Sequence, residues 1–251
     1  MTWPKLDCVR VVLVDTSHPG NIGASARAMW TMGLDQLTLV RPKHFPCAEA
    51  TARAAGADAL LYRATVCDSL EQALADCVWV VGTTVRSRHL DLPLLTPRGF
   101  AARAVEESRH GKVALVFGRE QAGLSNQELD LCQGVACIAS NPNFSSLNLA
   151  AAAQVFAYEL QLAFSGGPRE SPGAPGDDAA GAVTAAQLES FYLHLEQALT
   201  EIGYYDPRAP KLLMRRLRSL YGRARPDRAE LNILRGILAT TQRAAGTNSR
   251  E

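Results

Sequence analysis

The sequence lacks the features that identify several protein classes at once. Its six cysteines never form a Cys-x-x-Cys pair and several lie inside apolar runs, so we expect reduced, buried thiols rather than disulfides or a zinc site. No apolar run approaches the ~20 residues that cross a bilayer. The N-terminal residues also lack the pattern of a signal peptide. We therefore expect a soluble, cytoplasmic protein with no membrane partner and no bound metal.

The first glycine-containing turn, SHPGNIGASARA at residues 17–28, also lacks a cofactor signature. A dinucleotide fingerprint needs Gly-x-Gly-x-x-Gly, and a Walker loop ends in Gly-Lys-Ser or Gly-Lys-Thr. The second apolar run ends in Arg41 and Pro42 instead of the acidic residue that would hold a ribose. A nucleotide-dependent oxidoreductase is therefore a poor fit.

The sequence does contain a regular alternation of short apolar runs and alanine-rich segments of helical spacing up to about residue 140. Nearly continuous apolar runs are typical of strands buried on both faces of a parallel sheet. We expect strands at Val9–Val14, Leu37–Val40, Val78–Val81, Val113–Phe117 and Val135–Ala139. We expect helices at Ile22–Met32, Glu49–Ala55, Ser69–Ala75, Gly99–Ser108 and Glu128–Cys132. This order predicts an α/β domain with a mostly parallel sheet.

Several helix starts are marked by their own residues. Asn21 is a candidate cap for the first helix, which would place Arg27 about two turns inside it. Taken alone, Arg27 is more simply interpreted as a surface arginine paired with an acid. Ser125 with Glu128 and Thr184 with Gln187 fit capping boxes.

The composition changes at residue 165 and divides the chain. Residues 166–183 are rich in glycine, proline and small polar residues, which predicts a flexible linker between a domain at 1–165 and a helical extension at 184–251. The extension carries 11 basic and 7 acidic residues, formally +4, and most of the excess lies in residues 211–228. A solvated helix face and a surface for a phosphate backbone explain this basic stripe equally well.

Two later turns place polar residues directly after core strands. The strand before Gly118 is followed by Arg119 and Glu120, and the turn before the helix at Leu149–Leu160 contains Ser145, Ser146 and Asn148. Such residues lie at the carboxyl end of the sheet, where α/β folds place ligands.

The segments NIGASARA, LVFGREQAGL and IASNPNFSSLNLAAA together resemble the three motifs of the SPOUT-superfamily ribose 2′-O-methyltransferases, in the TrmH-like branch. VDTSHPGNIGASARAMWTMGL and VGTTVRSRHLDLPLLTPR extend the resemblance to the TrmJ-type tRNA (cytidine/uridine-2′-O-)-methyltransferases. The resemblance covers nearly all of residues 8–165 and is weaker over the extension. It implies a C-terminal trefoil knot, S-adenosyl-L-methionine as cofactor and tRNA as partner. It also implies a homodimer whose site is shared across the interface.

The resemblance also implies site residues. The catalytic set is Asn21, Arg27, Glu120, Ser146 and Asn148. Positions expected to hold the methyl donor, mainly through backbone groups, are Thr83, Thr84, Val85, Gly118, Ile138, Ser145, Ser146 and Leu147. We expect Arg27 to bind phosphate and stabilise the developing alkoxide, because a guanidinium stays charged in proteins. Glu120 is expected to order its surroundings rather than take a proton.

Some alternatives remain open from the sequence. Ser146 is as well explained as a helix cap as by ribose contact, and His18 as a structural hydrogen-bonding group rather than a base. Arg86 and Arg88 are either RNA contacts or members of a solvated loop. The leading function is ribose methylation of cytidine or uridine at position 32 of the tRNA anticodon loop. The alternatives are the same chemistry at another tRNA or ribosomal site, or RNA binding without catalysis.

Overall fold

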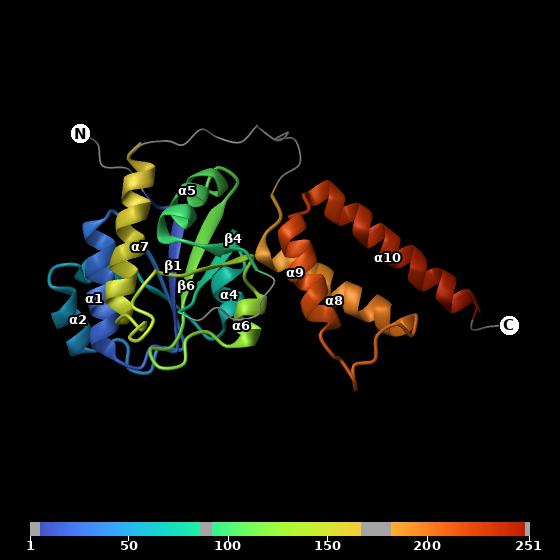
Figure 1. Cartoon of the computed structure of the whole chain (residues 1–251), viewed down its shortest axis with the longest axis horizontal. Coiled ribbons are helices and arrows are strands. Elements are labelled where there is room, and N and C mark those ends of the chain that lie inside the picture. Colours follow the sequence, from blue (N-terminus) through green and yellow to red (C-terminus); the bar gives the residue numbers. More distant parts are fainter. Residues whose placement is uncertain (1–5, 86–91, 167–181, 249–251) are drawn as a thin grey trace.

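The computed structural model describes residues 6–85, 92–166 and 182–248, and its centre is a parallel sheet of seven strands (Figure 1). The strand order is β3-β2-β1-β6-β4-β7-β5, and every pairing is parallel. The strands are β1 Val9–Val14, β2 Gln36–Val40, β3 Thr65–Cys67, β4 Cys77–Thr83, β5 Leu94–Leu95, β6 Lys112–Phe117 and β7 Gly134–Ala136. The predicted α/β class with a parallel sheet is therefore confirmed.

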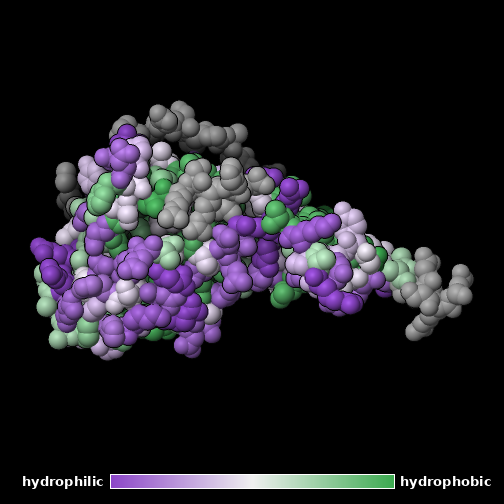
Figure 2. All heavy atoms as spheres, turned by 60° about the horizontal axis from the view of Figure 1, so that its bottom comes forward, coloured by the Kyte–Doolittle hydropathy of each residue, from purple (hydrophilic) through white to green (hydrophobic). Residues whose placement is uncertain are grey.

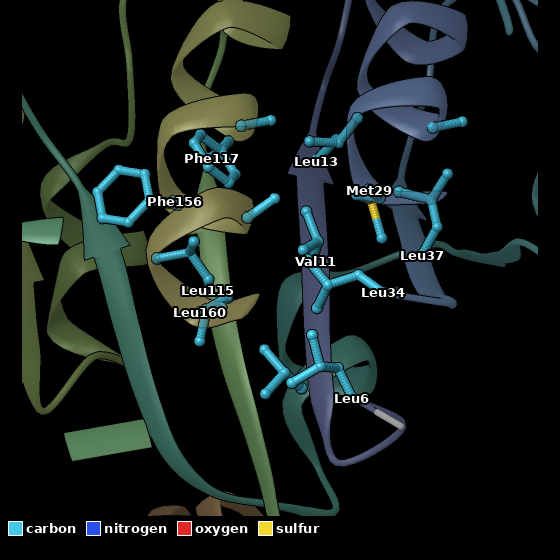
Figure 3. Packing of buried hydrophobic residues seen from close by; sticks show 14 of the residues in the cluster. Leu6, Val11, Leu13, Met29, Leu34, Leu37, Leu115, Phe117, Phe156 and Leu160 are labelled. Atoms are coloured by element: carbon cyan, nitrogen blue, oxygen red, sulfur yellow. The ribbon is translucent and has the colours of Figure 1, made fainter. Parts of the chain in front are cut away.

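Alternate residues of the central strands face two separate hydrophobic cores, as the two-residue period of a strand requires. Val11 and Leu13 belong to a core that includes residues of α1, α2, α3, α5 and α7 (Figure 3). Val12 and Val14 belong to a second core under α4 and α6. These helices are α1 Pro19–Thr31, α2 Ala48–Ala54, α3 Asp58–Tyr62, α4 Leu70–Leu74, α5 Pro97–Glu107, α6 Asn126–Asp130 and α7 Leu149–Phe164.

Four aromatic rings fix α5 and α7 against the sheet. Trp79 stacks on Phe100 at 5.5 Å between ring centroids, and Phe156 makes edge contacts with Phe100 and Phe117, each at 5.8 Å. Each aromatic pair contributes about 0.5–1.5 kcal/mol beyond the burial of its area. The position of α7 matters for the site, because its first turn lies at the carboxyl edge of the sheet.

The C-terminal residues form a helical module of three helices with its own small core. The helices are α8 Ala185–Glu201, α9 Leu213–Ala224 and α10 Arg228–Asn248. Phe191, Tyr192, Leu195 and Leu231 form the buried centre of the module. The module lies beside α4, β4 and α6 of the α/β domain (Figure 1).

Arginines of the basic stripe hold this module in place. The carboxylate of Glu107, only 5% exposed, pairs with Arg225 of the module and accepts a hydrogen bond from Arg103 at 3.2 Å. Arg215 pairs with Asp130 of α6 at 3.0 Å. Inside the module, Arg218 donates to Glu189 at 2.7 Å. Part of the stripe is thus neutralised by carboxylates instead of facing solvent.

The structure corrects several predicted boundaries. Helix α1 begins at Pro19 with His18 as its N-cap residue, so Asn21 lies inside the first turn and does not cap it. Strand β4 extends to Thr83, so Thr83 is the last strand residue rather than a turn residue. Strand β7 ends at Ala136, so Ile138 lies beyond it and not within it. Both predicted capping boxes are present, at Ser125 and at Thr184.

Candidate active site

Glu120 joins the turn after β6 to the turn after β1. One carboxylate oxygen, Oε2, accepts hydrogen bonds from the backbone N–H of Ser17 at 3.2 Å and from its hydroxyl at 3.0 Å. The other oxygen, Oε1, accepts from the backbone N–H of His18 at 3.2 Å and from Asn21 Nδ2 at 3.0 Å. Two segments about a hundred residues apart in sequence are therefore connected by one side chain.

Asn21 extends this connection to the third predicted motif. Its Oδ1 accepts from Asn148 Nδ2 at 2.9 Å. Asn148 is the N-cap of α7, and its Oδ1 accepts from the backbone N–H groups of Ala150 and Ala151 at 2.9 and 3.4 Å. We call the three residues the Glu120–Asn21–Asn148 relay. It confirms the predicted meeting of the three motifs at one edge of the sheet.

The relay has one consistent orientation. An ionised carboxylate only accepts hydrogen bonds, so Asn21 must present its NH2 group to Glu120 and its oxygen to Asn148. Asn148 must then direct its own oxygen to the free N–H groups of α7. The charge state of Glu120 thereby sets the direction of both amides.

The environment of Glu120 favours its ionised form. Partial burial raises the pKa of the carboxyl, but the hydrogen bonds from Asn21, Ser17 and His18 lower it more, and the net pKa lies below its ordinary value. A lowered pKa keeps this carboxyl ionised near neutral pH, which is compatible with the expectation that Glu120 orders its surroundings rather than takes a proton.

A charged network lies next to the relay. Arg41 donates to Asp15 at 3.2 and 3.1 Å, and Arg119 donates to both carboxylate oxygens of Glu128 at 2.9 and 3.0 Å. Arg119 also pairs with Asp15. Hydrogen bonding and charge from Arg41 and Arg119 lower the pKa of Asp15. We call these four residues the Asp15 network.

The network and the relay hold the same two turns. Asp15 and Arg119 pair with each other, Ser17 follows two residues after Asp15, and Glu120 follows directly after Arg119. Asp15 and Arg41 also have positive φ angles of 48° and 46°, a conformation that non-glycine residues keep only where neighbours enforce it. The network therefore fixes the distance between the donors of Ser17 and the carboxylate of Glu120.

Replacing Arg119 by glutamine is expected to lower kcat for the enzymatic reaction by about 10- to 100-fold, because a displacement of about 1 Å in the relay is costly. Arg10→Gln is the matched control, because Arg10 pairs with Asp76 at 2.6 Å near the amino-terminal ends of β1 and β4, at the opposite edge of the sheet. Both variants should lose thermal stability to a similar degree, and only Arg119→Gln should lose turnover. Equal losses of turnover would contradict a positioning role.

The positions predicted to hold the methyl donor lie around the same edge. Thr83 Oγ1 donates to the carbonyl of Val116 at 3.1 Å, and Thr84 N donates to the carbonyl of Ala136 at 3.0 Å. A Cβ on Gly118 would lie 2.2 Å from the carbonyl carbon of Gly123, so this turn requires glycine. Ser140 Oγ donates to the carbonyl of Ser145 at 2.9 Å and holds the last loop.

This set is chemically suited to a cationic nucleoside ligand. None of the eight predicted residues is charged, so none of their side chains repels a sulfonium. Val85, Ile138 and Leu147 are the apolar members of this set, the residue type that ligand pockets use against a flat ring. No group of three or more potential metal ligands occurs in the described ranges.

Arg27 is placed differently from the relay. It lies on the exposed side of α1 and has no ion pair among the described residues. Six residues separate it from Asn21, which puts the two side chains roughly 120° apart around the helix axis. Within one chain, therefore, Arg27 and the relay face different directions.

Other predicted residues have simpler positions. His18 contributes its backbone N–H to Glu120, while its exposed ring lies 3.5 Å from Glu49. Ser146 is not the N-cap of α7, because Asn148 takes that position. Arg86 and Arg88 lie outside the described residues. A cavity of about 340 Å³ between the module and the α/β domain contains none of the predicted site residues.

Sequence reasoning did not select Ser17, Asp15 or Arg41 as parts of the site. Ser17 acts through its backbone as well as its hydroxyl, and a backbone donor has no residue signature. Asp15 and Arg41 follow β1 and β2 directly, as Arg119 follows β6. That shared position after a core strand was the available signal.

These features define an α/β protein whose site is assembled from three strand-to-helix turns at the carboxyl edge of a parallel sheet. The SpoU rRNA Methylase family model matches residues 8–158, and the chain belongs to this family. The family model described as the C-terminal domain of tRNA methyltransferase TrmJ matches residues 186–250.

Similar proteins extend over nearly the whole chain. The tRNA (cytidine/uridine/adenosine-2′-O-)-methyltransferase TrmJ of Pseudomonas aeruginosa (strain UCBPP-PA14) is 51% identical over 96% of each chain. The tRNA (cytidine/uridine-2′-O-)-methyltransferase TrmJ of Cronobacter sakazakii is 48% identical over 94% of this chain and 97% of the relative. The crystal structure of TrmJ from Z. mobilis ZM4 superposes with a TM-score of 0.79 at 36% identity, covering 92% of this chain and 97% of that one.

Proposed function

We propose that this protein transfers a methyl group from S-adenosyl-L-methionine to the ribose 2′-hydroxyl of cytidine or uridine at position 32 in the tRNA anticodon loop. The observation that carries the proposal is the Glu120–Asn21–Asn148 relay, which unites the three turns of a SpoU methylase site. The relatives similar over nearly the full length are named as tRNA 2′-O-methyltransferases, one of them for adenosine as well.

The bound cofactor supplies a methyl group on a positively charged sulfur, so the reaction is a displacement that needs no metal. The residues of the chain have to orient the ribose and stabilise its oxygen as the proton leaves. Asn148 is the N-cap of α7 and Ser146 lies two residues before it, and in this proposal both orient the ribose. Arg27 binds a phosphate of the RNA and stabilises the developing alkoxide.

The exposed position of Arg27 supports a shared site. We include in the proposal a homodimer in which Arg27 of one subunit completes the site of the other, and a trefoil knot at the C-terminal end of the α/β domain. In this arrangement the outward direction of Arg27 is functional, because its partner is a second copy of the chain and its RNA. The assembled enzyme works in the cytoplasm, where its tRNA substrate is found. No helix of the described residues is long and apolar enough to cross a bilayer.

The helical module is included as a tRNA-binding extension, and the domain division at residues 1–165, 166–183 and 184–251 belongs to the same proposal. Arg215, Arg218 and Arg225 already pair with carboxylates. The basic residues of the stripe that remain exposed and make no ion pair in the described structure are Lys211, Arg216 and Arg228.

Replacing Lys211, Arg216 and Arg228 together by alanine is expected to weaken tRNA binding and to reduce the slope of log affinity against log salt by about 1 per lost phosphate contact. Affinity for S-adenosyl-L-methionine should not change. The control replaces Arg63, Arg109 and Lys112 at the opposite edge of the sheet: Arg63 and Arg109 precede β3 and β6, and Lys112, which pairs with Asp76, is the first residue of β6. Equal salt slopes for the two triple variants would remove the module from the RNA surface.

The function itself is tested by mapping 2′-O-methylated riboses in tRNA from cells that lack the gene. Loss of the methyl group at position 32, and its return with the purified protein and S-adenosyl-L-methionine, is the expected result. Loss at another position would identify a different target for the same chemistry. Unchanged methylation at every tRNA position would contradict the proposal, and thermal protection by NAD instead of S-adenosyl-L-methionine would support an oxidoreductase.

A further inference from the structure

Phe144 is a solvent-exposed aromatic residue on the loop that leads into Asn148 of the relay. Its residue surface is 81% exposed, although burying a phenylalanine side chain typically stabilises a fold by about 1.5–3 kcal/mol. It belongs to the loop between β7 and α7, four residues before Asn148. Four residues span at most about 14 Å, so the ring lies within reach of the relay.

The backbone on both sides of Phe144 is fixed by hydrogen bonds. Phe144 N donates to the carbonyl of Asn141 at 2.9 Å, and Asn143 N donates to Asn141 Oδ1 at 2.9 Å. The next residue, Ser145, has its carbonyl bound by Ser140 Oγ at 2.9 Å. The loop therefore presents the ring outward from a hydrogen-bonded turn.

The surroundings of the ring favour a polar ligand with an aromatic face. Its neighbours along the loop are Asn141, Pro142, Asn143, Ser145 and Ser146, which are amides and hydroxyls with a single proline. Surfaces that bind another protein normally gather several apolar side chains. Figure 2, in which the lower edge of Figure 1 comes forward, shows a mainly hydrophilic surface over the α/β domain. One ring among hydrogen-bonding groups fits a nucleobase, because a base offers both a π-face and polar edges.

We propose that Phe144 is a stacking platform for the base of the target nucleotide in the RNA substrate. This inference rests on the proposed function and adds a base contact to it. Stacking is tolerant of base identity because every base has a π-face. Such a contact suits a site that accepts cytidine and uridine, since hydrogen bonds to N3 and to the group at position 4 would separate the two bases. The amides and hydroxyls of the same loop then remain available for the ribose and phosphate.

The test compares Phe144→Ala, Phe144→Leu and Phe144→Trp in the full-length protein. Loss of the ring should lower kcat/KM for tRNA by roughly 5- to 150-fold, the range of one base–aromatic stack. Phe144→Leu keeps apolar volume without a π-face and should fall nearly as far, whereas Phe144→Trp should keep most of the activity. Tyr62→Ala is the control, because Tyr62 is 83% exposed on α3 and should be neutral.

A second measurement identifies the base that is contacted. An RNA with an abasic ribose at the target position should be a poor substrate for the natural protein, and Phe144→Ala should cause no further loss with it. Additive losses would overturn the proposal, as would normal turnover by Phe144→Leu. Dissociation of a dimer, or weakened binding of S-adenosyl-L-methionine, in Phe144→Ala would also overturn it, because the ring would then be a subunit contact or part of the cofactor site. If the natural protein methylates no tRNA, the proposed function fails, while tRNA binding by the same variants still tests the stacking contact.

Discussion

Arg27→Ala is expected to lower kcat for ribose methylation by at least about 100-fold, because it removes the charged group that stabilises the developing alkoxide. Binding of S-adenosyl-L-methionine should be nearly unchanged, since Arg27 lies apart from the turns that hold the donor. Stability should also be unchanged, because the side chain is exposed and has no ion pair within the described parts of its own chain. Single-turnover rates and calorimetric cofactor binding measure the two effects separately.

A mixing experiment distinguishes a shared site from a site within one chain. Arg27→Ala and Asn148→Ala subunits are each inactive alone, but a heterodimer of the two has one site with both residues intact. Random mixing should therefore restore about a quarter of the natural activity in a two-fold dimer. Arg27→Lys is the conservative control, and it should recover only part of the activity because an ammonium lacks the planar donor fork. Zero recovery from the mixture would place Arg27 in the site of its own chain, and normal turnover by Arg27→Ala would remove it from the mechanism.

The sheet was predictable because its central strands are continuous apolar runs, which are typical of strands buried on both faces. The short edge strands were not predicted. β3 has three residues with Val66 54% exposed, and β5 has only two residues, so neither shows a core pattern. Helix α3, with five residues, was missed for the same reason. These elements form because the neighbouring strands supply partners, which is information that a local window does not contain.

Two helix starts had competing caps, and the cap predicted at Asn21 was wrong while the cap at Ser146 had been left open. Asn21 is a good capping residue, but Pro19 fits the first turn of a helix and α1 starts three residues earlier than predicted, which leaves the Asn21 side chain for Glu120. Ser146 is also a good capping residue, but Asn148 adjoins the helix and takes the cap. In both cases the correct residue was present in the sequence, and only the three-dimensional partner decided between the candidates.

The resemblance selected Asn21, Glu120 and Asn148, and the structure brings these three together. It did not give their connectivity, because Glu120 and Asn21 are 99 positions apart and no spacing rule links them. The Asp15 network was missed because charged side chains after strands have many possible partners. Arg27 has no ion pair among the described residues of one chain, so one chain does not show what it contacts.

Glu120→Gln is expected to lower kcat by roughly 10- to 100-fold although it changes the shape of the side chain very little. The carboxylate accepts from four donors, two on each oxygen. Glutamine has one oxygen, so its NH2 group must face either the donors of Ser17 or those of His18 and Asn21. A reversed Asn21 would present its NH2 group to Asn148, and a reversed Asn148 would present its own to the N–H groups of α7. The disturbance therefore reaches the cap of α7, where loss of a capping hydrogen bond costs about 0.5–2 kcal/mol.

The stability of Glu120→Gln as a function of pH tests whether the charge of Glu120 holds the relay. The pKa of Glu120 is lowered in the folded protein, so its stabilisation is complete above the pKa of the unfolded chain and is lost as pH falls through the lower folded value. The natural protein should therefore be more stable than Glu120→Gln at neutral pH, and the difference should shrink only in strongly acidic solution. Glu49→Gln is the control, because Glu49 is an exposed carboxylate near the same turn. This variant should leave turnover unchanged. A stability difference between the natural protein and Glu120→Gln that stays constant from neutral to strongly acidic pH would mean that the charge of Glu120 does not hold the relay.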